Sequence, residues 1–140
     1  MIRENYRNKI TELIKVYNKF YQERNKIGIS LRNEISEAEF SEVLGQIKAV
    51  CIMYPDVDIL IDASNLKGFD SEMMVDAYRL FSKYRGSVRK VAITTHDGFG
   101  EYVADLFREF EKVRLKVFRP DEYEKARVWA LSPDPTQIYT

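Results

Sequence analysis

The sequence has few of the side chains that build disulfides and metal sites. It contains one cysteine, Cys51, and one histidine, His96. A disulfide within the chain needs two cysteines, and a zinc site needs three or four ligands. We therefore expect no internal disulfide, no metal site and no cofactor. We expect Cys51 to be a buried, unreactive thiol on the inner face of a helix.

The sequence also lacks a charge excess and a long apolar run. Lysine and arginine together number 22, as do aspartate and glutamate, so the formal net charge is zero. A nucleic-acid-binding domain normally has a basic excess, so the composition argues against nucleic acid as a partner, although it does not describe local patches. No apolar run approaches the roughly 20 residues that a membrane span needs, and the N-terminus lacks the apolar stretch of a signal peptide. We expect a cytoplasmic protein with one domain over residues 1–140, in which 1–17 form an extension and 132–140 a tail.

The chain is organised around residues 57–86. The segment 57–62 is a short apolar run that is rich in β-branched residues, and this pattern predicts a buried strand. Residues 63–69 contain the turn formers Asn65 and Gly68 and predict a loop. A helix then runs from Glu72 to about Tyr84 and closes at Gly86.

The flanking segments predict further strands and helices. Apolar residues between Ile10 and Tyr21 recur at helical spacing, but a hairpin of 18–24 with 27–33 is the reading we prefer. Ser36 and Glu39 form a capping box that begins a helix running to about Met53. The remaining predicted elements are a strand over 88–95, a helix over 98–111 capped by Asp97 with Tyr102 inward, a strand over 113–118 near a sheet edge, and a helix over 121–131 with Tyr123 inward. Strands that alternate with helices imply a mainly parallel sheet, which the hairpin makes mixed.

The C-terminal run resembles a known family. Residues 117–129, which end in Ala126-Arg127-Val128-Trp129, resemble the closing strand and helix of the SpoIIAA-like family, and the resemblance covers roughly residues 27–131. That family is similar to the STAS domains, and its fold is also likened to CRAL-TRIO lipid carriers. The resemblance implies an α/β, STAS-like domain with a mixed sheet of four or five strands and about four helices. It also implies a non-enzymatic role.

The same resemblance makes Ser71 the sharpest candidate site. In classical anti-sigma factor antagonists the phosphorylated serine lies in an Asp-Ser-Ser-Gly motif, eight residues after the Asp that closes a strand. Asp62 and Asp70 have this spacing, so Ser71 falls on the target position, with Ser64 in the intervening segment. Here Glu72 and Met73 replace the second Ser and the Gly. The alternative is that Asp70 or Ser71 only caps the helix.

A second candidate is an apolar stripe on the same helix. The stripe is wider than one buried face needs, and adaptable methionines suit a pliable pocket or a partner surface. Ordinary core packing is the alternative. The candidate contact residues are Phe69, Met73, Met74, Tyr78 and Phe81.

Two other groups of residues carry weaker predictions. Asp58, Asp62 and Asp70 could pair as acid and base, but we predict no catalytic residues. The segment 96–100 follows a strand, where open α/β sheets bind ligands, but it lacks a complete dinucleotide fingerprint. We therefore predict a regulatory module that binds a protein partner. The alternatives are a carrier of a small apolar or lipid-like ligand held between helix 71–85 and the sheet, and a structural homodimer.

Overall fold

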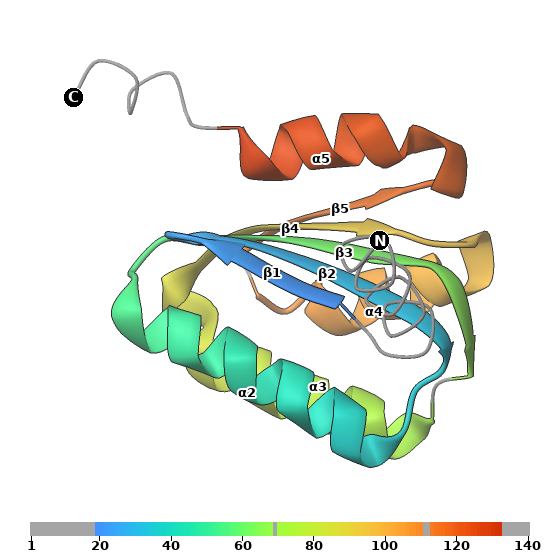
Figure 1. Cartoon of the computed structure of the whole chain (residues 1–140), viewed down its shortest axis with the longest axis horizontal. Coiled ribbons are helices and arrows are strands. Elements are labelled where there is room, and N and C mark those ends of the chain that lie inside the picture. The colour runs from blue at the N-terminus through green and yellow to red at the C-terminus, as the bar shows by residue number, and fades with distance from the viewer. Residues whose placement is uncertain (1–18, 69, 111–112, 133–140) are drawn as a thin grey trace, which may run out of the picture.

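The computed structural model describes residues 19–68, 70–110 and 113–132 (Figure 1). Its centre is one sheet of five strands in the order β1-β2-β3-β4-β5. The strands are β1 Lys19–Glu23, β2 Lys26–Glu34, β3 Val57–Gly68, β4 Val88–Thr94 and β5 Arg114–Phe118. β1 pairs antiparallel with β2, and all other pairs are parallel. The mixed, mainly parallel sheet, its N-terminal hairpin and the edge position of β5 are confirmed.

Within the described residues, four helices cover the two faces of the sheet unequally (Figure 1). The helices are α2 Glu37–Met53, α3 Ser71–Tyr84, α4 Asp97–Phe107 and α5 Tyr123–Leu131, with short 3-10 turns at Arg85–Ser87 and Pro120–Glu122. α2, α3 and α4 lie on one face, and α5 alone lies on the other. The order of elements from β1 to α5 agrees with the prediction, whereas the helical alternative for the N-terminus falls mainly on residues 1–18, outside the described residues.

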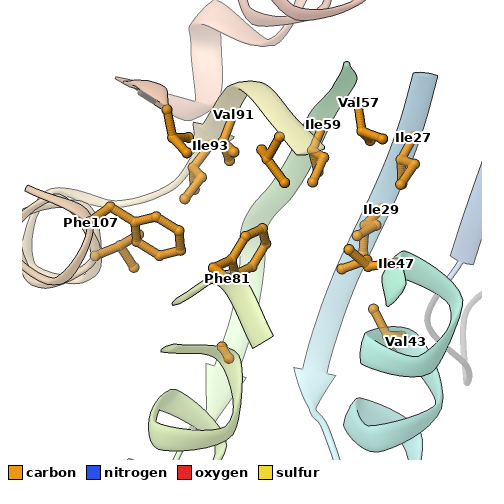
Figure 2. Packing of buried hydrophobic residues seen from close by; sticks show 14 of the residues in the cluster. Ile27, Ile29, Val43, Ile47, Val57, Ile59, Phe81, Val91, Ile93 and Phe107 are labelled. Atoms are coloured by element: carbon orange, nitrogen blue, oxygen red, sulfur yellow. The ribbon is translucent and has the colours of Figure 1, made fainter. Parts of the chain in front are cut away.

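The main core lies between the sheet and the three helices, and Figure 2 shows ten of its residues by name. Alternate residues of β2 and β3, such as Ile27, Ile29, Val57 and Ile59, point toward the helices, which supply Phe81 and others. Each such side chain contributes about 1.5–3 kcal/mol when it is fully buried. A smaller cluster fixes α5 to the opposite face, and its buried members are Leu60, Ala92, Phe118, Ala126 and Ala130.

The predicted loop over residues 63–69 is wrong for residues 63–68, because β3 continues to Gly68. β2 extends beside it, pairing Arg32 with Asn65 and Glu34 with Gly68. Two register shifts and a positive φ of 56° at Asn33 accommodate the polar residues. Pairing with a long neighbouring strand therefore overrides the turn formers, since strand preference depends mainly on context.

Three details of the later helices also differ from the prediction. α4 begins at Asp97, so His96 and not Asp97 occupies the N-cap position. Tyr102 and Tyr123 are exposed instead of inward. In α4 the inward positions belong to Val103 and Phe107, and Tyr102, next to Val103 on the helix, turns about 100° away from the sheet.

Candidate functional site

Ser71 is the first residue of α3, and its side chain is exposed. The residue before it, Asp70, is the N-cap, and its Oδ1 accepts a hydrogen bond from the Met73 amide at 2.9 Å. A capping carboxylate satisfies one of the amides that the first turn leaves without an intrahelical partner, and its charge suits the positive end of the helix. Asp70 therefore caps the helix, and Ser71 follows the cap as an exposed residue.

Carboxylates gather around this helix start. Glu37 in the first turn of α2 lies close to Glu72 of α3, and a hydrogen bond with Glu72 is the largest cause that raises the pKa of Glu37. The negative charges of Glu72, Asp70 and Asp76 raise the pKa of Glu37 further. Among the described residues, no lysine or arginine forms a salt bridge with any of these four carboxylates. The start of α3 therefore carries an uncompensated negative charge.

Asp62 and Ser64 lie together, upstream of Ser71. Asp62 Oδ1 accepts hydrogen bonds from the Ser64 amide at 3.1 Å and from the Thr94 hydroxyl at 2.8 Å. The bond from Thr94 ties β3 to the last residue of β4, whereas the bond from Ser64 lies within β3. From Ser64, four more strand residues carry the chain about 13 Å before it turns into α3.

Asp58 is the most deeply buried carboxylate of the described residues, with no solvent exposure. It accepts hydrogen bonds from Lys26 and from Arg89, whose Nε lies 2.9 Å from Oδ1, and Lys90 Nζ lies 3.9 Å from Oδ2. Burial acts to raise the pKa of Asp58, but the hydrogen bonds from Arg89 and Lys26 and the charges of Lys26 and Lys90 outweigh it, and the pKa lies below its ordinary value. Asp58 is thus an ionised structural anchor.

The three aspartates that could have paired as acid and base have separate partners. Asp58 is held by cations at the start of β3, Asp62 by Thr94 at mid-strand, and Asp70 by the first turn of α3. No hydrogen bond in the described structure joins any two of them. The structure therefore does not bring the predicted acid–base candidates together.

The predicted apolar stripe on α3 divides between the core and the surface. Met73, Met74 and Phe81 are buried, Tyr78 is half-buried, and Phe69 lies outside the described residues. Met74 and Phe81 line an apolar cavity of about 60 Å³ between the helices and the sheet, together with Ala77. Tyr78 donates a hydrogen bond from its hydroxyl to Glu109 at 2.8 Å, and this bond raises the pKa of Tyr78.

The structure adds a surface groove that the sequence did not predict. This α3–α4 groove has a volume of about 310 Å³ and is lined by Met74, Val75, Tyr78, Tyr102, Asp105, Leu106 and Glu109. Val75 is 46% exposed and Tyr102 is 50% exposed, which is high for large apolar side chains. The excess width of the α3 stripe was the available signal, but Tyr102 was assigned to the core.

A second unpredicted groove, of about 670 Å³, lies on the other face between the hairpin and α5. Both cations and acids line it, namely Lys26, Arg32, Arg127, Glu23 and Asp62. Lys26 is paired with Asp58, and Arg127 donates to Glu124. The groove therefore has no clear preference for either sign of charge.

The remaining residues that the sequence singled out have structural roles, or the geometry shows no role for them. A Cβ at Gly100 would lie 2.7 Å from Val117 Cγ1, so this glycine permits the close approach of α4 to β5. Cys51 is buried, and burial raises the pKa of its thiol to about 11. In the described ranges, no three metal-binding side chains gather in one place, and no helix is long and apolar enough to cross a bilayer.

The model of the SpoIIAA-like family matches residues 26–131 of the chain. Among solved structures, the chain is similar to an uncharacterised protein of the DUF3478 family with a SpoIIAA-like fold from Shewanella loihica PV-4. The two chains are 16% identical, with a TM-score of 0.62 over 81% of this chain and 91% of that chain. The anti-sigma factor antagonist SpoIIAA in its unphosphorylated form is 12% identical, with a TM-score of 0.48 over 83% of this chain and 99% of that chain. No curated protein matches the chain.

Proposed function

The chain belongs to the SpoIIAA-like family, and on this premise we propose that it is a non-catalytic regulatory module that binds a protein partner near the start of α3. The proposed surface comprises Asp70, Ser71 and the outer side of α3. The observation that supports the proposal is that Asp70, and not the neighbouring Ser71, caps the helix. Ser71 can therefore be modified without loss of the cap.

A phosphate on Ser71 would act by repulsion. It adds a charge of about −1.5 to −2 at neutral pH, next to Glu72 and near Glu37 and Asp76. The helix dipole favours this charge, whereas the nearby carboxylates oppose it. We expect phosphorylation to push the start of α2 away from the start of α3 and so to change the shape and the charge of the partner surface.

The test combines mass spectrometry with affinity capture. The full-length protein from its own cells should carry phosphate on Ser71, and Ser71→Ala should remove it. Ser71→Asp should change the affinity for the captured partner at least fivefold, about 1 kcal/mol. Ser41→Asp, at an exposed serine on α2, is the matched control and should leave the affinity unchanged. Absence of phosphate, with equal affinities for all three variants and the wild type, would contradict the phospho-switch.

The apolar cavity supports a second candidate, a carrier of a small apolar ligand. Its lining is wholly apolar and includes Met74, whose flexible side chain can adapt to a guest. The cavity volume is about 60 Å³, whereas a cavity that holds one benzene molecule has about 150 Å³. A lipid-like ligand would therefore require the helices to move outward.

Native and denaturing mass spectrometry separate the candidates. An adduct present only in the native spectrum, and lost in Ala77→Leu, would favour the carrier. A mass that doubles with concentration, without adduct or phosphate, would favour the structural homodimer.

A further inference from the structure

The α3–α4 groove is a preformed apolar surface between two helices. Ring contacts join α3 to α4 and to the turn that follows α4: Phe81 and Phe107 have centroids 4.9 Å apart, and Tyr78 and Phe110 have centroids 5.4 Å apart. Of the residues that line the groove, Val75 and Tyr102 remain about half exposed. A groove of this kind, bounded by helices and with an apolar floor, is the usual receptor for the apolar face of an amphipathic helix.

Acids, and no cations, line this groove. Asp105 and Glu109 lie on the α4 side. Asp105 forms an exposed ion pair with Arg108 at 2.8 Å, whereas Glu109 accepts a hydrogen bond from Tyr78 and has no salt bridge among the described residues. Val75 also lines an adjoining hollow of about 350 Å³, which contains Glu72 and Asp76 and, as the one cation among its lining residues, Arg79. The two hollows share Val75, and the four acids that line them form what we call the acidic rim. A partner should therefore present cations around its apolar face, because complementary charge guides association and excludes wrong partners.

We propose that the α3–α4 groove binds a basic amphipathic helix of a partner protein, with apolar side chains against Val75 and Tyr102 and lysines or arginines facing the acidic rim. This inference rests on the proposed function and specifies the partner's recognition element. A second copy fits less well, because a two-fold contact would place the same acidic rim on both sides.

The same geometry gives the expected sign of the Ser71 switch. Ser71 lines the hollow that adjoins the groove at Val75. A phosphate there would extend the acidic rim, so phosphorylation should strengthen binding of the basic helix. The strengthening should decrease with added salt, since exposed charges are screened within about 10 Å at moderate ionic strength.

The test uses the full-length protein and a fluorescent synthetic helical peptide with leucines along one side and lysines beside them. Its twin carries glutamate in place of every lysine. We expect the lysine peptide to bind at least tenfold more tightly than its twin, and Val75→Asp or Tyr102→Asp to weaken its binding about tenfold, because each places a charge in the apolar contact. Val128→Asp is the matched control, since Val128 is 49% exposed but lies on α5.

Several outcomes would overturn the proposal. Equal binding of both peptides, or equal loss in Val75→Asp and Val128→Asp, would mean that the peptide binds without using the groove. A concentration-dependent dimer that Val75→Asp dissociates would assign the groove to a second copy. Slow thiol labelling of Val75→Cys beside fast labelling of Val128→Cys would show that the chain already covers the groove.

A capture experiment distinguishes the two levels of the hypothesis. If the natural partner responds to Ser71 variants but binds Val75→Asp normally, the regulatory function stands and the helix-docking inference fails. If the partner ignores Ser71 but is lost with Val75→Asp, the groove stands and the phospho-switch fails.

Discussion

Removal of the charge at Asp58 should strongly destabilise the fold. Asp58 is completely buried and faces three cations, namely Lys26, Arg89 and Lys90. Asp58→Asn preserves the size of the side chain and one acceptor oxygen, but it leaves these cations without their counter-charge. Breaking a buried ion pair by removing one partner typically costs about 3–5 kcal/mol.

The expected loss lies near the lower end of this range. Lys26 and Arg89 are 16% and 21% exposed, so water can partly solvate them after the substitution. Lys90 is almost buried, but its Nζ also donates to the Trp129 carbonyl at 2.9 Å, which keeps one partner. We expect a loss of about 3 kcal/mol, which corresponds to a fall in the urea midpoint of about 1.5 M for a slope of about 2 kcal/mol/M.

Urea unfolding of Asp58→Asn and Asp105→Asn in parallel tests this estimate. Asp105 forms an ion pair with Arg108 at 2.8 Å, but its side chain is 67% exposed, so its loss should change stability by less than about 1 kcal/mol. Equal midpoints for the two variants would refute the claim that burial makes the Asp58 cluster important.

The pH dependence of stability gives a second readout of the same cluster. The pKa of Asp58 is lowered from its ordinary value of 3.8 in the folded state, so its ionisation stabilises the fold above that value. This contribution is lost as the pH falls through the folded pKa, below 3.8. The wild type should therefore show an acid-induced loss of stability that Asp58→Asn lacks. Parallel acid profiles would contradict this assignment.

Two further predictions follow from packing. Gly100→Ala should destabilise the protein by about 1–3 kcal/mol in urea unfolding, because its Cβ would clash with Val117. Adding Val117→Ala should recover part of this loss of stability. If the double variant instead loses the sum of the two single losses, the proposed contact is contradicted. Burial raises the pKa of the Cys51 thiol to about 11. A thiol reagent at mildly alkaline pH should therefore not label Cys51 in the native protein but should label it after unfolding. Rapid labelling of the native protein would instead show that α2 opens.

Local sequence patterns predicted most of the elements because side-chain spacing decides them. In α2, the Ser36 hydroxyl accepts from the Glu39 amide at 3.1 Å and also donates to the Glu39 carboxylate at 2.9 Å. This arrangement involves only residues 36–39, so the sequence of these four residues is enough to predict the start of the helix. The end of β3 could not be predicted in this way, because residues 63–68 form a strand only by pairing with β2, some 30 positions earlier in the chain.

The candidate site shows the same division between local and long-range information. The capping role of Asp70 depends on one helix turn, and capping by Asp70 or Ser71 was the alternative that the sequence offered. The proximity of Glu37 to Glu72 depends on how α2 packs beside α3, which no local pattern reveals. The sequence did not predict the groove at Val75, because helical spacing placed Tyr102 on the inner face together with Val103 and Phe107, whereas in the structure only the latter two are buried.

A net charge of zero does not mean that the protein lacks an electrostatic surface, because the fold separates its charges. Lys26, Arg89 and Lys90 surround Asp58 in the interior near the start of β3. The acids at the start of α3 follow the other end of that strand, which closes at Gly68, ten residues and about 33 Å along the strand from Asp58, and they are exposed. These cations are paired with Asp58 and contribute to stability, and none of them forms a salt bridge with the acids of α3 in the described residues. The protein therefore presents a negative surface at the start of α3, and the apolar groove beside it gives that charge a site where a partner helix can bind.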